Sequence, residues 1–522
     1  MQEPSIEATW ERVALAISAA EVHHHDEWRE HFLTILRDFR FLPGGRILAN
    51  AGTSRRVTLF DCFVMGPVED SVSGIFSSLR EAMLTLQSGG ETGVDFSTLR
   101  PACSQAVSSG SVASGPVSFV KVWNEATAVL ASGNVQHGAL QLALRCDHPD
   151  IEAFIDAKIS HGALPNFKLS VLLTEEFMHA VEDDGVWTLA FPLAGHSVPE
   201  GGEVCVRVWP GSVAPQPCLV HRRLSARSLW DKLLAAEHAV GEPGVLFIDR
   251  INSANNLWYC EHLYATSYGG DIPLPAYGVC NLGSINLPRF VKHSSSEHLR
   301  LNFGSLKDAV SIAVRFLDNV HDISPFPLKA QQKAAWASRR IGLGVTGLAD
   351  LFAMLGVSYG SQESLALTRE IMNTVRDSAY RTSIAIAQEK GAFPEFDKIK
   401  YGASPFVLGL SHEIQDLIAQ HGMRNSHLLM VAPTESLSLL ANNVSSGMAP
   451  ISSRLAVDVS VEDQLHMISA VQACVDNVVS TAVHLPQNTS QQEIGLIFQQ
   501  AWRLGLKSCV VKLKDDTSGS VE

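Results

Sequence analysis

The sequence predicts an α/β protein, and three observations support this prediction. Short β-branched or apolar runs alternate with amphipathic helical stretches from about residue 57 to residue 485, a pattern typical of parallel sheets covered by helices. The 522 residues exceed an ordinary single domain but suit a large α/β barrel that forms one unit. A hydrophobic content of 46% with 18% charged residues describes a folded globular chain. Periodicity alone does not choose between a barrel and a doubly wound sheet.

The first 40 residues are expected to be helical. Apolar residues recur there at helical spacing in two groups, which are Trp10, Val13, Ala14 and Ile17, and then Phe32, Ile35, Leu36 and Phe39. His23-His24-His25 lies between the groups. We interpret it as a solvated helix end or turn, because a metal site would need ligands converging from elsewhere.

Later elements follow the same reasoning. We expect strands at residues 57–60, 169–173 and 429–432, and helices at residues 74–87, 228–240 and 364–390. Residues 191–225 and 289–300 are expected to be loops, and the polar tail from Lys512 is expected to fray. We find no linker long enough to divide the chain and no internal repeat.

Composition and charge exclude several function classes. The net charge of −14 argues against a nucleic-acid partner, because phosphate backbones require clustered Lys and Arg, although one small phosphorylated ligand stays possible. We find no apolar run of membrane-spanning length and no signal sequence at the start, so we expect no membrane partner and a cytoplasmic location. The nine cysteines include no Cys-x-x-Cys pair, so no metal site is predicted and most thiols should be reduced and buried.

The most informative stretch is Tyr264–Leu287, which contains Ala265-Thr-Ser-Tyr-Gly-Gly-Asp271 and Gly278-Val-Cys-Asn-Leu-Gly-Ser284. It resembles the active-site segment of a ribonucleotide reductase large subunit. Other segments resemble that family in the family's order, and they cover nearly the whole chain. These segments are Phe41–Thr53, Cys62–Gly66, Asp70–Phe76, Ser88–Ser97, Ala113–Phe119, Arg145–Glu152, Pro243–Arg250, Arg339–Asp350 and Asn443–Gly447. The chain most resembles the adenosylcobalamin-dependent class.

This resemblance implies a ten-stranded α/β barrel made of two parallel five-stranded halves, with a finger loop through its centre. It implies an N-terminal helical segment at residues 1–55, the barrel at 56–490, and a C-terminal helix, strand and tail at 491–522. Compared with the family, we expect the N-terminal segment to be too short for the ATP-binding regulatory domain that many members carry. The resemblance also implies adenosylcobalamin as a possible cofactor and a possible homodimer.

The resemblance assigns a catalytic role to the cysteines of the barrel. Two reducing cysteines of the family correspond to Cys62 and Cys280. The finger loop normally reads Asn-Pro-Cys-Gly-Glu, and its cysteine carries the radical. Here the five positions read Ser267-Tyr-Gly-Gly-Asp271, so Gly269 stands at the radical position. Ser267 replaces the amide, and Asp271 keeps a carboxylate that is one methylene shorter.

Other thiols or phenols are weaker candidates for the missing radical. Tyr268 stands next to the lost position, but a tyrosyl radical abstracts hydrogen less readily than a thiyl radical. Cys260 is expected to be a packing residue, and Cys509 to lie alone in a strand. The tail also lacks the cysteine pair with which relatives re-reduce the site.

The expected substrate-binding residues are Ser114, Asn166, Thr434, Glu435 and Ser436. The family's Pro-Thr-Gly-Thr phosphate loop reads Pro433-Thr-Glu-Ser436 here, and Glu435 would repel a phosphate. The loop at residues 133–138 has lost the family's arginines.

These differences leave three hypotheses for the function. We favour a repurposed enzyme that acts on a nucleotide-like or other small substrate, because Ser267, Asp271, Glu435 and Ser436 are polar replacements that could form a new site with Cys62 and Cys280. A catalytically inactive homologue that binds or regulates is the alternative. Adenosylcobalamin-dependent ribonucleoside-diphosphate reduction by a non-standard route is the third hypothesis.

Overall fold

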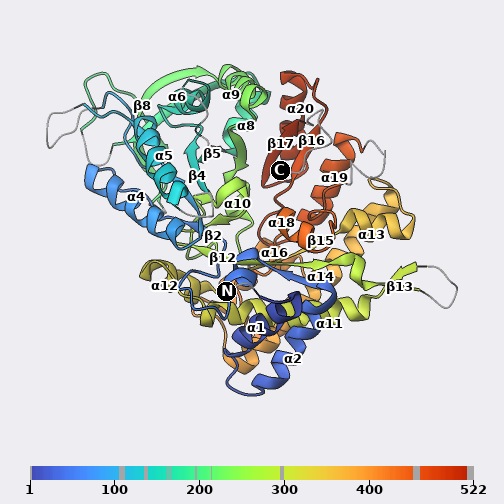
Figure 1. Ribbon diagram of the computed structural model, residues 1–522. Helices are drawn as coiled ribbons and strands as arrows, with labels where there is room; N and C mark the ends of the chain where they lie inside the picture. The colour runs from blue at the N-terminus through green and yellow to red at the C-terminus, as the bar shows by residue number, and fades with distance from the viewer. Residues whose placement is uncertain are drawn as a thin grey trace.

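The computed structural model describes residues 3–104, 112–133, 139–160, 164, 166–193, 197–212, 214–293, 299–450 and 459–513. Five parallel strands form the first half of a barrel (Figure 1). In spatial order they are β2 (Cys62–Val64), β3 (Glu91–Asp95), β4 (Leu140–Arg145), β5 (Phe167–Leu173) and β9 (Gly244–Phe247). Strands β4 and β5 are buried along most of their length, as expected for parallel strands covered on both faces.

The second half contains five further strand segments. Strand β12 (Val279–Asn286) runs parallel to β15 (Ile341–Thr346), and β16 (Ala482–Leu485) runs parallel to β17 (Ser508–Leu513). Two single bridges, Leu343 to Leu429 and Val431 to Val479, connect β15 through the extended segment around residue 430 to the residues just before β16. The strand expected at residues 429–432 is therefore present only as these two bridges.

The two halves meet in antiparallel pairs at both seams. Strand β12 pairs with β2, and β17 pairs with β9, so the hydrogen bonds pass round the complete ring. This arrangement confirms the predicted ten-stranded barrel of two parallel halves. Strand β17 lies beyond residue 490 and is one of the ten. A further short strand, β1 (Phe41–Pro43), pairs antiparallel with residues 283–285 of β12.

Helices surround the ring, with α4, α5, α6 and α9 around the first half and α19 and α20 beside β16 and β17 (Figure 1). The predicted helices at residues 74–87, 228–240 and 364–390 are confirmed within α4, α9 and α14. The helices after the N-terminal segment are α4 (Val72–Gln87), α5 (Pro116–Gly133), α6 (Ile151–Ile155), α7 (Ala157–Ser160), α8 (Glu175–Glu182), α9 (Ala226–Val240), α10 (Ile248–Ser253), α11 (Phe303–Ile323), α12 (Lys329–Ser338), α13 (Leu348–Leu355), α14 (Gln362–Lys390), α15 (Lys398–Gly402), α16 (Pro405–Leu408), α17 (His412–His421), α18 (Glu435–Leu440), α19 (Val461–Gln472) and α20 (Gln491–Arg503).

The predicted N-terminal helical segment consists of α1 (Ile6–Ser18), α2 (His25–Leu36), a 3-10 turn η1 (Arg37–Phe39) and α3 (Gly45–Asn50). Helices α1 and α2 pack on α11 (Figure 1), where the ring of Phe32 lies 5.2 Å from that of Phe316. His24 takes a left-handed conformation before α2, which agrees with the interpretation of the histidine run as a helix boundary.

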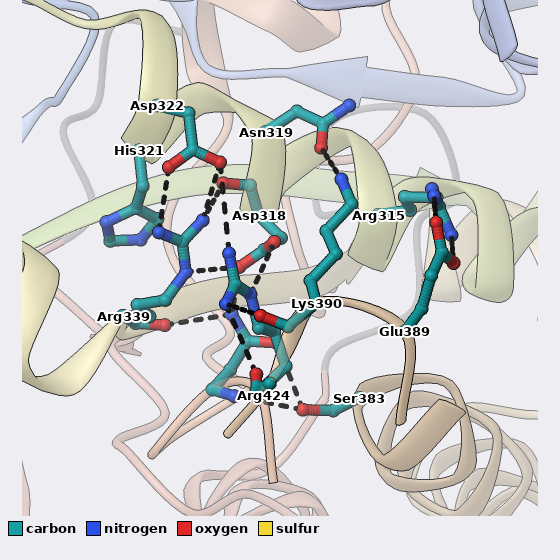
Figure 2. Close-up of polar contacts among 12 residues, drawn as sticks. Arg315, Asp318, Asn319, His321, Asp322, Arg339, Ser383, Glu389, Lys390 and Arg424 are labelled. Atoms are coloured by element: carbon teal, nitrogen blue, oxygen red, sulfur yellow. Dashed lines mark hydrogen bonds and ion pairs between the residues drawn. The ribbon is translucent and has the colours of Figure 1, made fainter. Parts of the chain in front are cut away.

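A buried ion network fixes this segment and α14 to α11, and Figure 2 shows the part of it that joins α11 to α14, Arg339 and Arg424. Arg315 on α11 binds Glu21 at 2.7 Å and also contacts Glu389. One turn further along α11, the fully buried Asp318 binds Arg339 at 2.8 Å and Arg424 at 3.1 Å. Burial opposes ionisation of Asp318, but the two guanidinium groups hold the pKa of its carboxyl below the ordinary value.

The finger loop is a short hairpin that enters the first half of the barrel. It contains β10 (Ala265–Thr266), a turn η2 (Tyr268–Gly270) and β11 (Pro273–Leu274), and it contacts β2, β3, β4 and β5. Gly93 on β3 permits this approach, because a Cβ atom there would overlap the backbone carbonyl of Thr266.

Three sequence predictions were wrong. Residues 57–60 precede strand β2 without forming a strand, because the amides of Leu59 and Phe60 donate to the hydroxyls of Ser324 and Thr58. Residues 191–225 are not simply a loop, since β7 (Val204–Arg207) and β8 (Gln216–Ser225) form an antiparallel sheet with β6 (Val186–Pro192). Residues 289–300 contain η3 (Leu287–Phe290) in part and a hairpin of β13 (Val291–His293) with β14 (Leu299–Leu301). Turn residues dominate these stretches and conceal the short strands between them.

Within the described residues, none of the helices combines the length and the apolar character needed to cross a membrane.

Candidate active site

Two cysteines from opposite halves of the barrel lie side by side at one seam. Cys62 on β2 is the direct register partner of Cys280 on β12. The Cα atoms of such antiparallel partners are about 4.5–5.5 Å apart, which is within the range that a disulfide spans. Both are free thiols in the barrel interior, with Cys62 at 1% and Cys280 at 0% exposure. The predicted proximity of these two residues is therefore present in the fold.

Their surroundings keep both thiols protonated. Burial raises the pKa of Cys62 well above its ordinary value, and the carboxylates of Glu91 and Asp61 raise it further. Burial likewise raises the pKa of Cys280. Since the thiolate is the form that attacks disulfides, neither cysteine is activated as a nucleophile at neutral pH.

A cavity of about 350 Å³ opens beside Cys62. Five of the predicted site residues line it, which are Cys62, Asp271, Thr434, Glu435 and Ser436. Cys280 lies behind its wall, and an ideal Cβ placed on the lining residue Gly342 would be 3.3 Å from the sulfur of Cys280.

A second cavity of about 390 Å³ adjoins the finger loop. The loop residues Tyr268, Gly269 and Asp271 line it, and Glu435 and Asp271 border both cavities. Gly269 has a φ of +79°, which favours glycine over every L-residue. Burial raises the pKa of Tyr268, so its phenol stays protonated at neutral pH.

Ser267 does not reach either cavity. Its side chain is fully buried, and its hydroxyl accepts a weak hydrogen bond of 3.4 Å from the amide of Ile272. Its own amide donates to the carbonyl of Ile272, so Ser267 closes the base of the finger loop. The expectation that Ser267 joins the polar groups of a shared cavity was wrong, because these local hydrogen bonds orient it into the hairpin.

Asp271 is held by a residue that the sequence did not indicate. The hydroxyl of Ser480 donates a hydrogen bond of 2.6 Å to its carboxylate. Burial raises the pKa of Asp271 to about 6, and Glu435 contributes in the same direction. Asp271 thus remains largely ionised at neutral pH and could accept a proton or a hydrogen bond from a ligand in either cavity.

Two further carboxyl groups, Asp61 and Glu91, line the first cavity. Asp61 immediately precedes β2 and Glu91 begins β3. Burial raises the pKa of Asp61 to about 6 and that of Glu91 to about 8, and Asp271 and Asp61 raise the latter further. Arg46, whose guanidinium lies 3.9 Å from the Asp61 carboxylate, opposes these shifts. Sequence reasoning missed these residues, because only the closed barrel brings them together.

The first turn of α18 does not present Thr434 to a ligand. The Thr434 hydroxyl contacts the hydroxyls of Thr346 at 2.7 Å and Ser438 at 3.1 Å, and it accepts from the amide of Gly447 at 3.1 Å. Glu435 is exposed and lies 3.8 Å from Lys512. The segment therefore offers a carboxylate where the sequence resemblance expects a phosphate-binding glycine.

The remaining predicted residues lie outside both cavities. Ser114 precedes α5 and accepts a hydrogen bond from Ser118, while Asn166 precedes β5. Cys260, expected to be a packing residue, is exposed and lines another cavity with Glu395. Most of the loop at residues 133–138 lies outside the described residues. No group of three or more His, Cys, Asp or Glu within the described ranges could hold a metal ion.

Comparisons with known proteins give the context for this geometry. The family model of the ribonucleotide reductase barrel domain matches residues 61–457, and that of the ribonucleotide reductase all-alpha domain matches residues 2–56. The vitamin B12-dependent ribonucleoside-diphosphate reductase of Mycobacterium tuberculosis strain H37Rv is 34% identical over 98% of this chain and 74% of its own length. The enzyme of that name from Thermoplasma acidophilum is 34% identical over 80% of this chain, but this chain covers 49% of it. The ribonucleoside-diphosphate reductase subunit alpha of Chlamydia pneumoniae is 26% identical over 82% of this chain and 44% of its own length.

Proposed function

The chain belongs to the ribonucleotide reductase large-subunit family, and from this premise we propose that it is a member with a remodelled active site. It acts on a nucleotide-like or other small substrate rather than as an ordinary ribonucleotide reductase. The observation that carries this proposal is the first cavity, where Cys62, paired with Cys280, adjoins a set of carboxylates and the tip of the neighbouring loop carries Gly269.

The proposed reaction uses the cysteine pair as a source of two electrons. Cys62 and Cys280 would each lose a hydrogen and form a disulfide, and the substrate would gain two electrons and two protons. Asp271 is the proposed acid–base group, because it borders the cavity and its pKa is raised to about 6. Tyr268 is a candidate for a redox role in the second cavity, which it lines.

Adenosylcobalamin is the proposed cofactor, because the relatives in Mycobacterium tuberculosis and Thermoplasma acidophilum are named vitamin B12-dependent. The second cavity tests its fit. Its lining includes the small residues Gly241, Gly244 and Ala482, but its described lining contains no cysteine. The residues present do not fit the radical chemistry of the family, since there is no thiol at the loop tip, and we derive no step through the cofactor.

The test separates cofactor binding from use of the cysteines. Reduced protein is incubated anaerobically with adenosylcobalamin and a panel of nucleosides and nucleotides, and cob(II)alamin is followed by absorbance and EPR. Mass spectrometry then quantifies a Cys62–Cys280 disulfide. A disulfide that forms only when one substrate is present supports a repurposed enzyme. Absence of cobalamin binding at high concentration removes the cofactor proposal.

A catalytically inactive homologue is the second candidate. The left-handed backbone at Gly269 and the buried, protonated state of both thiols favour it. This candidate predicts ligand binding without formation of the disulfide. A non-standard route of ribonucleoside-diphosphate reduction predicts instead that a diphosphate is the substrate that oxidises the pair. The possible homodimer is tested separately by light scattering.

A further inference from the structure

The first cavity has an unbalanced set of charges for a site in this family. Four carboxyl groups line it, from four separate segments, and these are Asp61, Glu91, Asp271 and Glu435. Arg46 is the single cationic side chain in its described lining. We propose that this cavity selects a ligand that carries a protonated amine and disfavours phosphate esters. The proposal rests on the proposed function, because it takes this cavity as the substrate site.

The geometry around Asp61 is the first support. Gly44 lies so close that a Cβ atom there would overlap the Asp61 carboxylate, so glycine at this position leaves space for the acid. Arg46 is 3.9 Å from one oxygen of Asp61, which commits part of its charge to that carboxylate. The other oxygen, Oδ2, is buried and receives no hydrogen bond from the described protein groups. A buried acceptor is stabilised by a donor, and an ammonium group offers three.

The environment of Glu91 is the second support. It faces Asp61, Asp271 and the thiol of Cys62, with Arg46 as the opposing cation. Burial and the two aspartates raise the pKa of Glu91 to about 8, so at neutral pH its carboxyl is largely protonated. A bound cation would favour the carboxylate instead. Binding of an amine near pH 7.5 should therefore release part of a proton from the protein.

The third support is that the Thr434 hydroxyl is already engaged at the place where the resemblance predicts phosphate binding. The Thr434 hydroxyl is surrounded by Thr346, Ser438 and Gly447, and the residue as a whole is only 5% exposed. Glu435 directly follows it and adds a negative charge at the cavity mouth. A diphosphate would meet four carboxyl groups against the guanidinium of Arg46 and the ammonium of Lys512, which lies 3.8 Å from Glu435, whereas a monocation would meet complementary charge.

The cation is expected to be organic rather than a metal. The carboxyl groups come from four segments, and the described residues contain no group of three or more ligands that could hold a metal ion. A volume of about 350 Å³ is sufficient for a molecule of nucleoside size. The proposed substrate class is thus a small amine, for which an amino-nucleoside is a suitable probe.

The first experiment uses three probes that share one nucleoside. Binding of 5′-amino-5′-deoxyadenosine, adenosine and adenosine 5′-diphosphate is measured by calorimetry at pH 7.5, with magnesium chloride alone as a separate titration. We expect the amine to bind at least tenfold more tightly than adenosine, and the diphosphate to bind most weakly. The advantage of the amine should fall at least threefold in Glu91→Gln and should persist in Glu200→Gln, an exposed carboxylate outside the lining of this cavity. Tightest binding of the diphosphate, or of magnesium alone, would overturn the proposal.

A second experiment reports the local potential without any substrate. Ser436 is exposed at the cavity and is changed to Cys in a protein whose exposed Cys103 and Cys260 are replaced by Ser. Cationic aminoethyl and anionic sulfonatoethyl methanethiosulfonate are compared for their rates of modification. We expect the ratio of cationic to anionic modification rates to be at least fivefold higher at position 436 of the S436C variant than at Cys103 of the wild type. Asp61→Asn should reduce this ratio.

The two experiments distinguish failure of the proposed function from failure of the charge inference. A cation preference at S436C with no binding of any nucleoside would remove the nucleoside-like substrate and leave the charge selection standing. Equal modification by both reagents would remove the charge selection, even if adenosine binds.

Discussion

Cys62 and Cys280 are direct partners across an antiparallel seam, although 217 residues separate them in the sequence. Neighbouring carboxylates and burial keep both thiols protonated. The fold therefore brings a cysteine pair together while suppressing its reactivity as thiolates. The pair is suited to a reaction that begins with a bound substrate rather than to exchange with thiols in solution.

The first prediction concerns this pair. Treatment with diamide should link Cys62 to Cys280, because their Cα atoms lie within disulfide range. The reaction should be slow at pH 7 and accelerate as pH rises, since the thiolate is the attacking species and both pKa values are raised. Peptide mapping by mass spectrometry measures the link.

Cys509→Ser provides the matched control, because Cys509 is also buried on a barrel strand but pairs in register with Val245. This variant should form the link as the wild type does, and Cys62→Ser should not. A link from Cys62 to any other cysteine would contradict the register of β2 and β12.

The second prediction concerns Glu91 and the pH dependence of stability. Burial raises its pKa from 4.5 to about 8, so between these values the folded protein holds a proton that the unfolded chain releases. The free energy of unfolding should therefore decrease as pH rises from about 4.5 to about 8. Glu91→Gln removes this contribution, and we expect it to exceed wild type by about 1–3 kcal/mol at pH 9 and to match it near pH 4.5.

Urea denaturation at several pH values measures this difference. A smaller slope of the same sign should remain in Glu91→Gln, because the pKa values of Asp61 and Asp271 are also raised, to about 6. Glu200→Gln should leave the pH profile of the wild type unchanged. Parallel profiles for Glu91→Gln and the wild type would show that Glu91 is not buried among the acids.

The third prediction concerns the approach of the finger loop to β3. Gly93→Ala places a methyl group on the carbonyl of Thr266 and should displace the loop, at a cost of about 1–3 kcal/mol in the free energy of unfolding. Gly244→Ala on β9 is the matched control, because its Cβ would have its nearest neighbour at 3.7 Å, an ordinary contact. Thermal unfolding compares the two, and equal losses would mean that the loop does not touch β3.

The fourth prediction concerns a cysteine introduced at position 269. Gly269 has a φ of +79°, and an L-residue in the left-handed region costs about 1–2 kcal/mol. Gly269→Cys should therefore be less stable than the wild type and should not reduce nucleoside diphosphates, because the acidic cavity and the engaged Thr434 remain. Gly402→Ala serves as a control, since no atom lies within 4 Å of its ideal Cβ. Diphosphate reduction by Gly269→Cys with adenosylcobalamin would show that the thiol alone is missing.

Particular residues show how far the sequence predicts this structure. The alternation of apolar runs and helical stretches predicts α4, α9 and α14, because each has its own amphipathic period. The resemblance predicts the barrel and the proximity of Cys62 to Cys280. Neither indicates that Asp61 and Glu91 face Asp271, since these carboxylates come from separate segments and their interaction depends on closure of the ring. The sequence places Ser267 among the polar groups of the site but does not give the direction of its side chain, which the tight hairpin turns away from both cavities.

The fifth prediction concerns the ion network under the N-terminal helices (Figure 2). Asp318 is fully buried and binds both Arg339 and Arg424, while the side chain of Asn425 donates to it at 2.9 Å. Asp318→Ala leaves two largely buried guanidinium groups with the partly exposed Asp322 as their remaining shared anion, and removal of one partner from such a network typically costs about 3–5 kcal/mol. Chemical denaturation measures the loss. Glu413→Gln, which breaks the exposed pair with Arg381, is the comparison and should have almost no effect because solvent screens that pair. Equal effects of the two variants would mean that Asp318 is solvated and that its ion pairs contribute little to holding α11 against its neighbours.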